Sequence, residues 1–265
     1  SKKLSEKVQS NELLIDALNG IGVCYHHKGD NRKSIQFKKE ALKIIEKLEN
    51  KRQTATLLNN IGWSQTYMGL FDEALETLKK AGESTTIDSK SYGHILNSTG
   101  NVLWRKGDYA NAMKTYHDAL QLHTKQNEKR GMAWHLGDIG KIHYELENFD
   151  EALKFINQSI TIQKNFGFGE VELELQSRLL ICLANKSLNR KTDSSELSEI
   201  IDKHNDNTFI DYDINYRIYQ LIGDKSYFEK SLEQVKRKLS EMNPDQQSRF
   251  TDCPIPKQIL SKKLT

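Results

Sequence analysis

Residues 97–119, NSTGNVLWRKGDYANAMKTYHDA, contain the pattern that decides the fold of this chain. Two runs with helical character flank the turn Lys106-Gly107-Asp108, and Gly100 lies seven residues before the turn glycine. A glycine inside a helix costs about 1 kcal/mol relative to alanine, and the usual reason to keep one is the close approach of a neighbouring helix. One helical hairpin cannot bury its own apolar face, so the stretch predicts further copies of itself.

Three further copies of the pattern occur, each with an interior glycine, a turn and a second helix. The interior glycines are spaced by 40, 38 and 40 residues: Gly22, Gly62, Gly100 and Gly140. The turns and the small residues of the second helices recur in the same register, the latter as Ser34, Ala74, Ala112 and Ala152, then Ala41, Ala81, Ala119 and Ser159. The repeat predicts an all-α chain, an α-α superhelical solenoid of helix-turn-helix repeats.

The repeat resembles the tetratricopeptide repeat (TPR) family in its 40-residue form, over residues 11–165. With the interior glycine as position 8, the large residue of position 4 is Leu18, Leu58, Leu96 and Leu136. Position 7 is isoleucine except for Thr99, position 11 departs from the family's tyrosine-like residue in two units, and position 24 is aromatic only at Tyr116.

The register divides the chain into four regions: a lead-in at residues 1–10, four TPR units at 11–165, two degenerate closing units at 166–243, and a C-terminal cap helix with a tail at 244–265. The second helices of the four units are expected at residues 35–48, 73–80, 109–121 and 151–162. Their charged residues, such as Lys38, Lys39, Glu76 and Lys79, are expected in solvent.

The closing region is expected to hold helices at residues 170–188, 196–204, 209–222 and 227–242. A last short helix begins with Asn243 as its cap and Pro244 at its first position. Pro254-Ile255-Pro256 is expected to break that helix and leave residues 257–265 frayed. The alternative that this proline segment lies extended in the chain's own groove stays open.

Composition gives no argument for nucleic acid or an anionic membrane as partner, because the net charge is only +3. Cys24, Cys182 and Cys253 form no CxxC and are odd in number, which favours a reducing, cytoplasmic setting. No run reaches the roughly 18 apolar residues of a membrane span, and no signal peptide is visible. The chain opens with Ser-Lys-Lys and no methionine, so we expect a fragment of a longer protein.

Residue patterns for catalysis or metal binding are missing from the sequence. There is no P-loop, GxSxG, HExxH or CxxC. The eight histidines are scattered, and none has a carboxylate or cysteine at metal-ligand spacing. We therefore expect neither an enzyme nor a cofactor or metal site.

The face opposite the packing positions carries the candidate binding residues. At about 100° per residue, positions 2, 5, 9, 12 and 13 of each first helix share this face, which lines a concave groove in the family that the repeat resembles. Position 5 holds Asn19, Asn59 and Asn97. Their amides can pair with a peptide backbone without reading its side chains, or instead bond to an adjacent helix or water. The resemblance implies peptide contact.

Aromatic and cationic residues add to this groove face. Tyrosine and tryptophan are common interface anchors, but Trp63 can equally be a packing wedge between neighbouring first helices. The remaining candidates are Asn101, Trp104, Arg105, Trp134, Lys141 and Tyr144. The lysine and arginine clamp of the chaperone-tail subfamily is missing, so that ligand is not predicted.

The end of the chain, from Gly223 to Pro256, also looks like the closing segment of bacterial multidomain signalling proteins with cyclase, kinase or ATPase modules. The resemblance implies a regulatory fragment of such a protein. Two functions follow. The first is a module that binds an extended or helical peptide segment of a partner protein in its groove. The second is a receptor whose superhelix closes on a small peptide or small-molecule signal.

Overall fold

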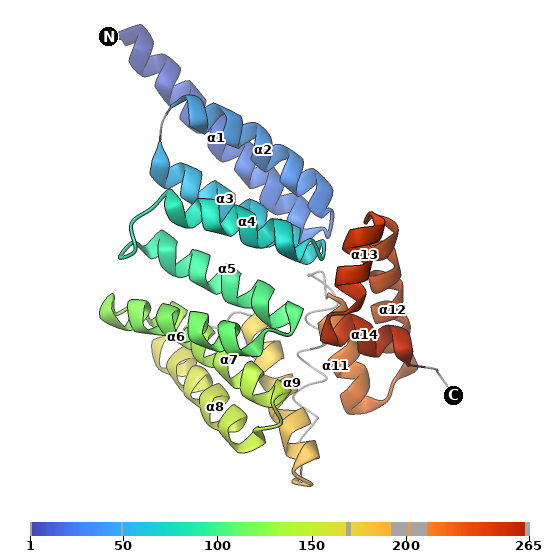
Figure 1. Ribbon diagram of the computed structural model, residues 1–265. Coiled ribbons are helices and arrows are strands. Elements are labelled where there is room, and N and C mark those ends of the chain that lie inside the picture. Colours follow the sequence, from blue (N-terminus) through green and yellow to red (C-terminus); the bar gives the residue numbers. More distant parts are fainter. Residues whose placement is uncertain (1, 49, 168–170, 192–200, 202–210, 263–265) are drawn as a thin grey trace. The chain divides into compact units, whose positions relative to one another are not determined.

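A computed structural model describes residues 2–48, 50–167, 171–191, 201 and 211–262 (Figure 1). All regular structure in these residues is helical. The chain divides into two compact units, Ser1–Val102 and Leu103–Thr265, and helix α5 (Lys90–Lys106) runs from the first into the second. The predicted all-α repeat architecture is confirmed.

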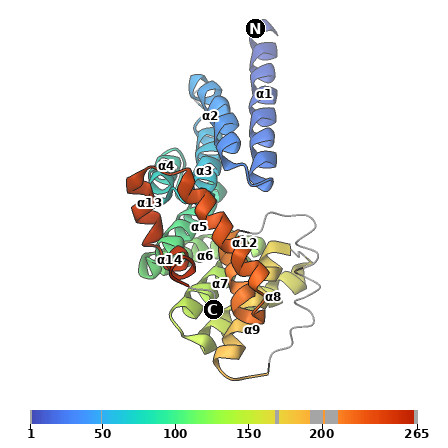
Figure 2. The same ribbon diagram turned by 90° about the vertical axis from the view of Figure 1, so that its right-hand side faces the viewer.

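The first unit stacks its helices in chain order: α1 (Lys2–His27), α2 (Asn31–Lys47), α3 (Lys51–Tyr67), α4 (Phe71–Glu83) and the beginning of α5. Each of α1 to α3 packs on the next helix. Asp30 caps α2 by accepting a hydrogen bond from the Lys33 amide, and Asn50 caps α3 in the same way from Gln53. The lead-in belongs to α1, whose N-terminal end projects beyond α2 (Figure 1, Figure 2).

The repeat glycines mark the contact between the two helices of a repeat. A Cβ atom on Gly22 would lie 2.9 Å from Lys38 Cγ, one on Gly62 would lie 2.8 Å from Leu78 Cγ, and one on Gly140 would lie 2.6 Å from Ile156 Cγ1. All three contacts are tighter than real Cβ atoms tolerate. The glycine therefore lets position 24 of the second helix approach the first helix, as the pattern predicts.

The second unit continues the repeats with α6 (Tyr109–Lys125), α7 (Lys129–Glu145) and α8 (Phe149–Phe166), followed by α9 (Val171–Ser187). The closing elements are α11 (Tyr212–Ile222), α12 (Lys225–Ser240), α13 (Pro244–Thr251) and α14 (Pro254–Ser261). One core cluster joins Trp104, Tyr116, Ile139 and Ile142, and another joins α9 to α11 through Leu179 and Ile218.

The C-terminal residues correct one prediction. Asn243 caps α13 in a capping box with Gln246, as expected. Pro254-Ile255-Pro256 does not leave a frayed tail but begins α14, because proline is tolerated in a first turn whose amides have no helical partner. Ile255 packs on the Trp104–Tyr116 cluster, and Pro256 and Ile259 are buried. The segment is therefore helical, not extended, while most of the helix expected at 196–204 lies outside the described residues.

Candidate functional site

The asparagines at position 5 all lie in the first unit, and all three side chains are half-buried. Asn19 Oδ1 accepts a hydrogen bond of 3.2 Å from Asn60 Nδ2, so this amide bonds to the adjacent helix. Asn59 and Asn97 differ. Each has a buried Oδ1 atom without a hydrogen-bond partner among the described residues. Asn101, one turn after Asn97, is half-buried as well.

Trp63 in the first unit fills a packing position. Its Nε1 donates to His26 Nε2 at 3.2 Å, and its ring lies 5.4 Å from the Tyr67 ring. The His26 ring meets Tyr67 edge-on at 4.9 Å. These contacts join α1 to α3, which favours the packing alternative for this tryptophan.

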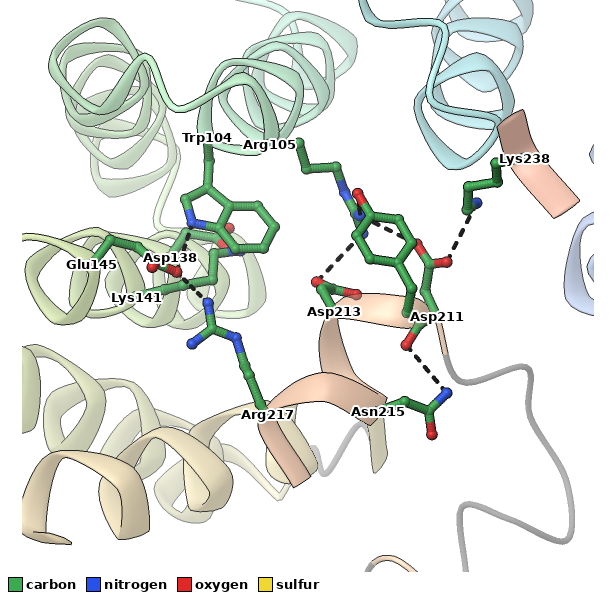
Figure 3. A network of polar contacts seen from close by, with 11 residues as sticks. Trp104, Arg105, Asp138, Lys141, Glu145, Asp211, Asp213, Asn215, Arg217 and Lys238 are labelled. Carbon is green, nitrogen blue, oxygen red and sulfur yellow. Dashed lines mark hydrogen bonds and ion pairs between the residues drawn. The ribbon is translucent and has the colours of Figure 1, made fainter. Parts of the chain in front are cut away.

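Three predicted groove residues of the second unit, Trp104, Arg105 and Lys141, lie in a buried polar network, which Figure 3 shows at close range. Trp104 is only 3% exposed, and Arg105 and Lys141 are also buried. Trp104 Nε1 donates to Glu145 Oε1 at 3.2 Å, and Lys141 Nζ lies 4.1 Å from the centre of the Trp104 ring. Lys141 also pairs with Asp138 at 2.7 Å.

Helices α11 and α12 supply the other half of this network. Arg105 contacts Asp211 at 3.2 Å and Asp213 at 3.6 Å, and its Nη1 donates to the Tyr212 hydroxyl at 3.3 Å. Lys238 of α12 pairs with Asp211 at 3.3 Å, and Arg217 of α11 pairs with Glu145.

Formal charges within the network balance. The four cations are matched by four carboxylates, namely Arg105, Lys141, Arg217 and Lys238 against Asp138, Glu145, Asp211 and Asp213. Burial alone would raise the pKa of the Asp211 carboxyl, but Lys238 and Arg105 hold that pKa below its usual value. Burial lowers the pKa of Lys238, against the opposing effect of Asp211. Buried charged side chains are tolerated inside a protein only when each is paired with an opposite charge.

The structure therefore separates the predicted groove residues into two sets. Trp104, Arg105 and Lys141 are covered by the chain's own α11 and do not offer an open surface. Tyr144 is half-buried, with the Arg217 guanidinium 5.4 Å from its ring centre. Trp134 is half-buried and does not belong to the network. Asn59 and Asn97 remain the candidates with unsatisfied amide oxygens.

Lys39, Glu76 and Lys79 of the second helices are exposed as expected, but the prediction was wrong for Lys38. It is 2% exposed, and its Nζ donates to the Asn60 carbonyl at 3.1 Å and to Ser64 Oγ at 2.8 Å. Ser64 Oγ also lies 3.0 Å from Ser34 Oγ. Burial lowers the pKa of Lys38 from 10.5 to about 8. Because Lys38 occupies position 24, which is apolar in the other repeats, the aligned register itself could have signalled its burial.

A buried histidine pair escaped sequence reasoning. His123 Nδ1 lies 3.1 Å from His135 Nε2, with the rings stacked at 5.0 Å. A Cβ atom on Gly131 would lie 1.8 Å from His123 Nδ1, so this glycine makes room for the ring. The sequence feature that could have predicted this pair is the position of the two histidines on consecutive helices, α6 and α7. No group of three His, Cys, Asp or Glu side chains in the described residues could hold a metal ion.

Comparison with known proteins identifies the family. The model of the MalT-like TPR region matches residues 15–251, and the chain belongs to this family. A search of curated proteins gives no match. Across the described residues, no helix has the length and apolar character needed to cross a bilayer.

Solved structures show the same fold at low identity. A Rap protein complexed with Competence and Sporulation Factor matches with a TM-score of 0.64 and 11% identity, over 98% of this chain and 79% of the other. The Rap conjugation gene regulator of plasmid pLS20, in complex with the Phr* peptide, matches with a TM-score of 0.59 and 13% identity, over 93% and 64%. BtubC (BKLC) from P. vanneervenii matches with a TM-score of 0.56 and 15% identity, over 76% and 89%.

Proposed function

We propose that this chain is a protein-interaction module whose first unit holds an extended peptide segment of a partner protein through Asn59 and Asn97. Both residues occupy position 5 of consecutive repeats, and α3 and α5 present them in the same register. A peptide backbone carries one donor and one acceptor on each residue other than proline, which an amide side chain can match. The two amides thus bind the backbone of the peptide, and neighbouring side chains of the module determine which peptide sequence is preferred.

The observation that carries this proposal is the contrast among three asparagines at one repeat position. Asn19 has an intramolecular partner, whereas the Oδ1 atoms of Asn59 and Asn97 have none among the described residues. A buried acceptor without a donor costs about 1 to 3 kcal/mol. Rotation of these half-buried amides toward a peptide N–H group would give each Oδ1 atom a donor and remove that cost. Peptide binding therefore explains the two asparagines, whereas packing within the chain leaves their Oδ1 atoms unsatisfied.

Two similar structures support a peptide as the ligand. Both Rap proteins are described in complexes, one with Competence and Sporulation Factor and one with the Phr* peptide. At 11% and 13% identity the likeness carries the fold alone, so the peptide ligand is a proposal for this chain. The second candidate function is a receptor whose superhelix closes on a small peptide or small-molecule signal, and the two complexes support it as well.

The wider setting is also proposed. Cys24, Cys182 and Cys253 are odd in number and form no CxxC, which supports a reducing, cytoplasmic location. The sequence resemblance of the last residues supports a regulatory role in a larger bacterial signalling protein. We also propose that the chain has no catalytic activity and that its partner is neither a nucleic acid nor a membrane.

Selection from a random peptide display library, followed by fluorescence anisotropy with the selected peptide, tests the proposal. We expect the double variant Asn59→Ala plus Asn97→Ala to bind roughly tenfold or more weakly, which corresponds to about 1.4 kcal/mol. Asn19→Ala is the matched control, because the same residue type at the same repeat position is already engaged by Asn60. Equal affinity of the double variant and the wild type would refute the role of the two amides.

Small-angle scattering separates the two candidate functions. A receptor that closes on its signal should lose radius of gyration when the peptide is added. A module that holds a segment in an already open groove should keep the radius of the free chain, since most pre-organised interfaces move little on binding.

A further inference from the structure

The first helix of the array leaves its stacking face uncovered. Positions 3, 7 and 10 of a first helix share one stripe, and in the second repeat they are Leu57, Ile61 and Ser64, all buried. In the fourth repeat the same positions are His135, Ile139 and Ile142, also buried. In α1 they are Ala17, Ile21 and Cys24, and all three are exposed.

The difference is large at the central isoleucine. Ile21 is 41% exposed, whereas Ile61 is 2% and Ile139 is 0% exposed. Toward the N-terminus of α1 the stripe continues with Leu13 and Leu14, which are also exposed. Isolated exposed apolar residues are normal, but a contiguous exposed stripe marks an interaction site.

The chain itself shows what covers this stripe in later repeats. On α3, the second helix of the preceding repeat contributes Ala41 and Ile45 against Leu57, and Ser34 against Ser64. On α7, the preceding second helix contributes Tyr116 against Ile139 and Ile142, and His123 against His135. The opposite face of α1, which contains Gly22, packs against α2 of the same repeat. The stripe through Ile21 is thus the place that a preceding second helix occupies in later repeats.

Charge at the edge of the stripe adds to this description. Glu12 and Asp16 are exposed beside Leu13 and Ala17. A helix that packs here with lysine or arginine along its flank would complement these carboxylates. Helix α2, which covers the equivalent face of α3, has exposed Lys39, Lys43 and Lys47.

We propose that the stripe Leu13, Leu14, Ala17, Ile21 and Cys24 is a docking surface for one amphipathic helix from outside these 265 residues. The helix has the character of a repeat's second helix: small and aliphatic residues along its seam, and basic residues on its flank. It extends the stack by the interface that already joins α2 to α3. This surface is separate from the peptide contacts at Asn59 and Asn97 and does not depend on them.

The probe is a labelled peptide with the sequence of α2 (Asn31–Lys47) and the substitution Lys38→Leu. On α3, Lys38 donates a hydrogen bond to Ser64, but the equivalent position of α1 is Cys24, so the charged amine would lack this acceptor. Fluorescence anisotropy with the full chain should show saturable binding. Ile21→Glu should weaken that binding about tenfold or more, because it places a carboxylate in the middle of the stripe and removes apolar area. Ile87→Glu is the matched control, since Ile87 is 66% exposed and outside the stripe.

Three outcomes of the binding experiment would overturn the proposal: no saturable binding, equal affinity of wild type and Ile21→Glu, or equal losses for Ile21→Glu and Ile87→Glu. Light scattering after size-exclusion chromatography measures the oligomeric state and so tests whether a second copy of the chain covers the stripe. A monomer is expected for the free chain. A dimer that Ile21→Glu dissociates would assign the stripe to self-association instead. Circular dichroism should be unchanged in both variants, because both positions are exposed.

Discussion

The polar groove positions of the first unit and those of the second unit have opposite environments. In the first unit, Asn59 and Asn97 are neutral, half-buried and without a partner for their Oδ1 atoms in the described residues. In the second, Arg105 and Lys141 are charged, buried and paired with carboxylates. The repeat scaffold is the same, so the difference comes from what covers the face. Where α11 and α12 supply the matching charges, the face becomes core; at Asn59 and Asn97, where no described residue supplies a donor to Oδ1, we propose that a ligand does.

Removal of one network cation should have the largest effect. Arg105→Met leaves Asp211 and Asp213 without their shared guanidinium, and an uncompensated buried charge costs about 3 to 5 kcal/mol. Urea unfolding measures the loss. The control is Arg190→Met, whose pair with Asp150 is exposed on both sides and should be worth less than about 1 kcal/mol. Similar losses for both variants would mean that the network is not a buried structural element.

The stacking shared by both units predicts a second effect. Gly140→Ala puts a Cβ atom 2.6 Å from Ile156 Cγ1 and 3.1 Å from the Ala152 carbonyl oxygen, so we expect a loss of about 1 to 3 kcal/mol from overpacking. Gly20→Ala, in the first unit, has nothing within 4 Å and should gain about 1 kcal/mol from helix propensity. Thermal unfolding compares the two. Opposite shifts support the register, and shifts of the same sign argue against it.

Buried Lys38 in the first unit has no carboxylate partner among the described residues, unlike the cations of the second unit. This difference predicts a pH-dependent stability. Lys38→Met should raise the free energy of unfolding at pH 7 by about 1 to 3 kcal/mol, because it removes a desolvated charge. The pKa of Lys38 falls from 10.5 to about 8 on folding, so the unfolded chain binds more protons between these values. Wild-type stability should therefore rise with pH in that window, and the advantage of the variant should shrink.

Denaturant unfolding at pH 7 and pH 10 measures this advantage. An advantage that stays constant between the two would show that folding does not lower the pKa of Lys38.

The smallest expected effect is at the asparagines themselves. Asn59→Ala and Asn97→Ala should leave the stability of the free chain unchanged or raise it by about 0.5 kcal/mol, because alanine has the higher helix propensity and no hydrogen bond is lost from Oδ1. Asn19→Ala should be destabilising, since Asn60 loses its acceptor. Calorimetric melting temperatures separate these cases; a clear loss for Asn59→Ala would indicate a packing role.

The sequence predicted the periodic part of the fold because its cause is local. An interior glycine every 38 to 40 residues, a turn, and small residues in the second helix specify one unit, and the packing of Gly62 against Leu78 repeats at Gly140 against Ile156. Capping could also be predicted, as at Asn243. The helix at Pro254 could not, because its stability depends on Ile255 reaching a core cluster far away in the sequence.

The candidate site was harder to predict for the same reason. Arg105 and Asp211 are separated by more than two repeats, and no periodicity relates them, so Arg105 read as a groove cation. Lys38 read as a surface residue because its acceptors, the Asn60 carbonyl and Ser64, belong to the next repeat. Position 5 could be identified because it recurs. Whether each asparagine is engaged depends on its neighbour, as Asn60 shows for Asn19.

The most direct test of this difference between the units is the NMR spectrum of the asparagine and tryptophan side chains during titration with a selected peptide. We expect that the Nδ2 amide signals of Asn59 and Asn97 shift with saturation, while the Nε1 signal of Trp104, which is hydrogen-bonded to Glu145, does not. A shift of the Trp104 signal without any change at Asn59 and Asn97 would contradict it and place the ligand in the second unit.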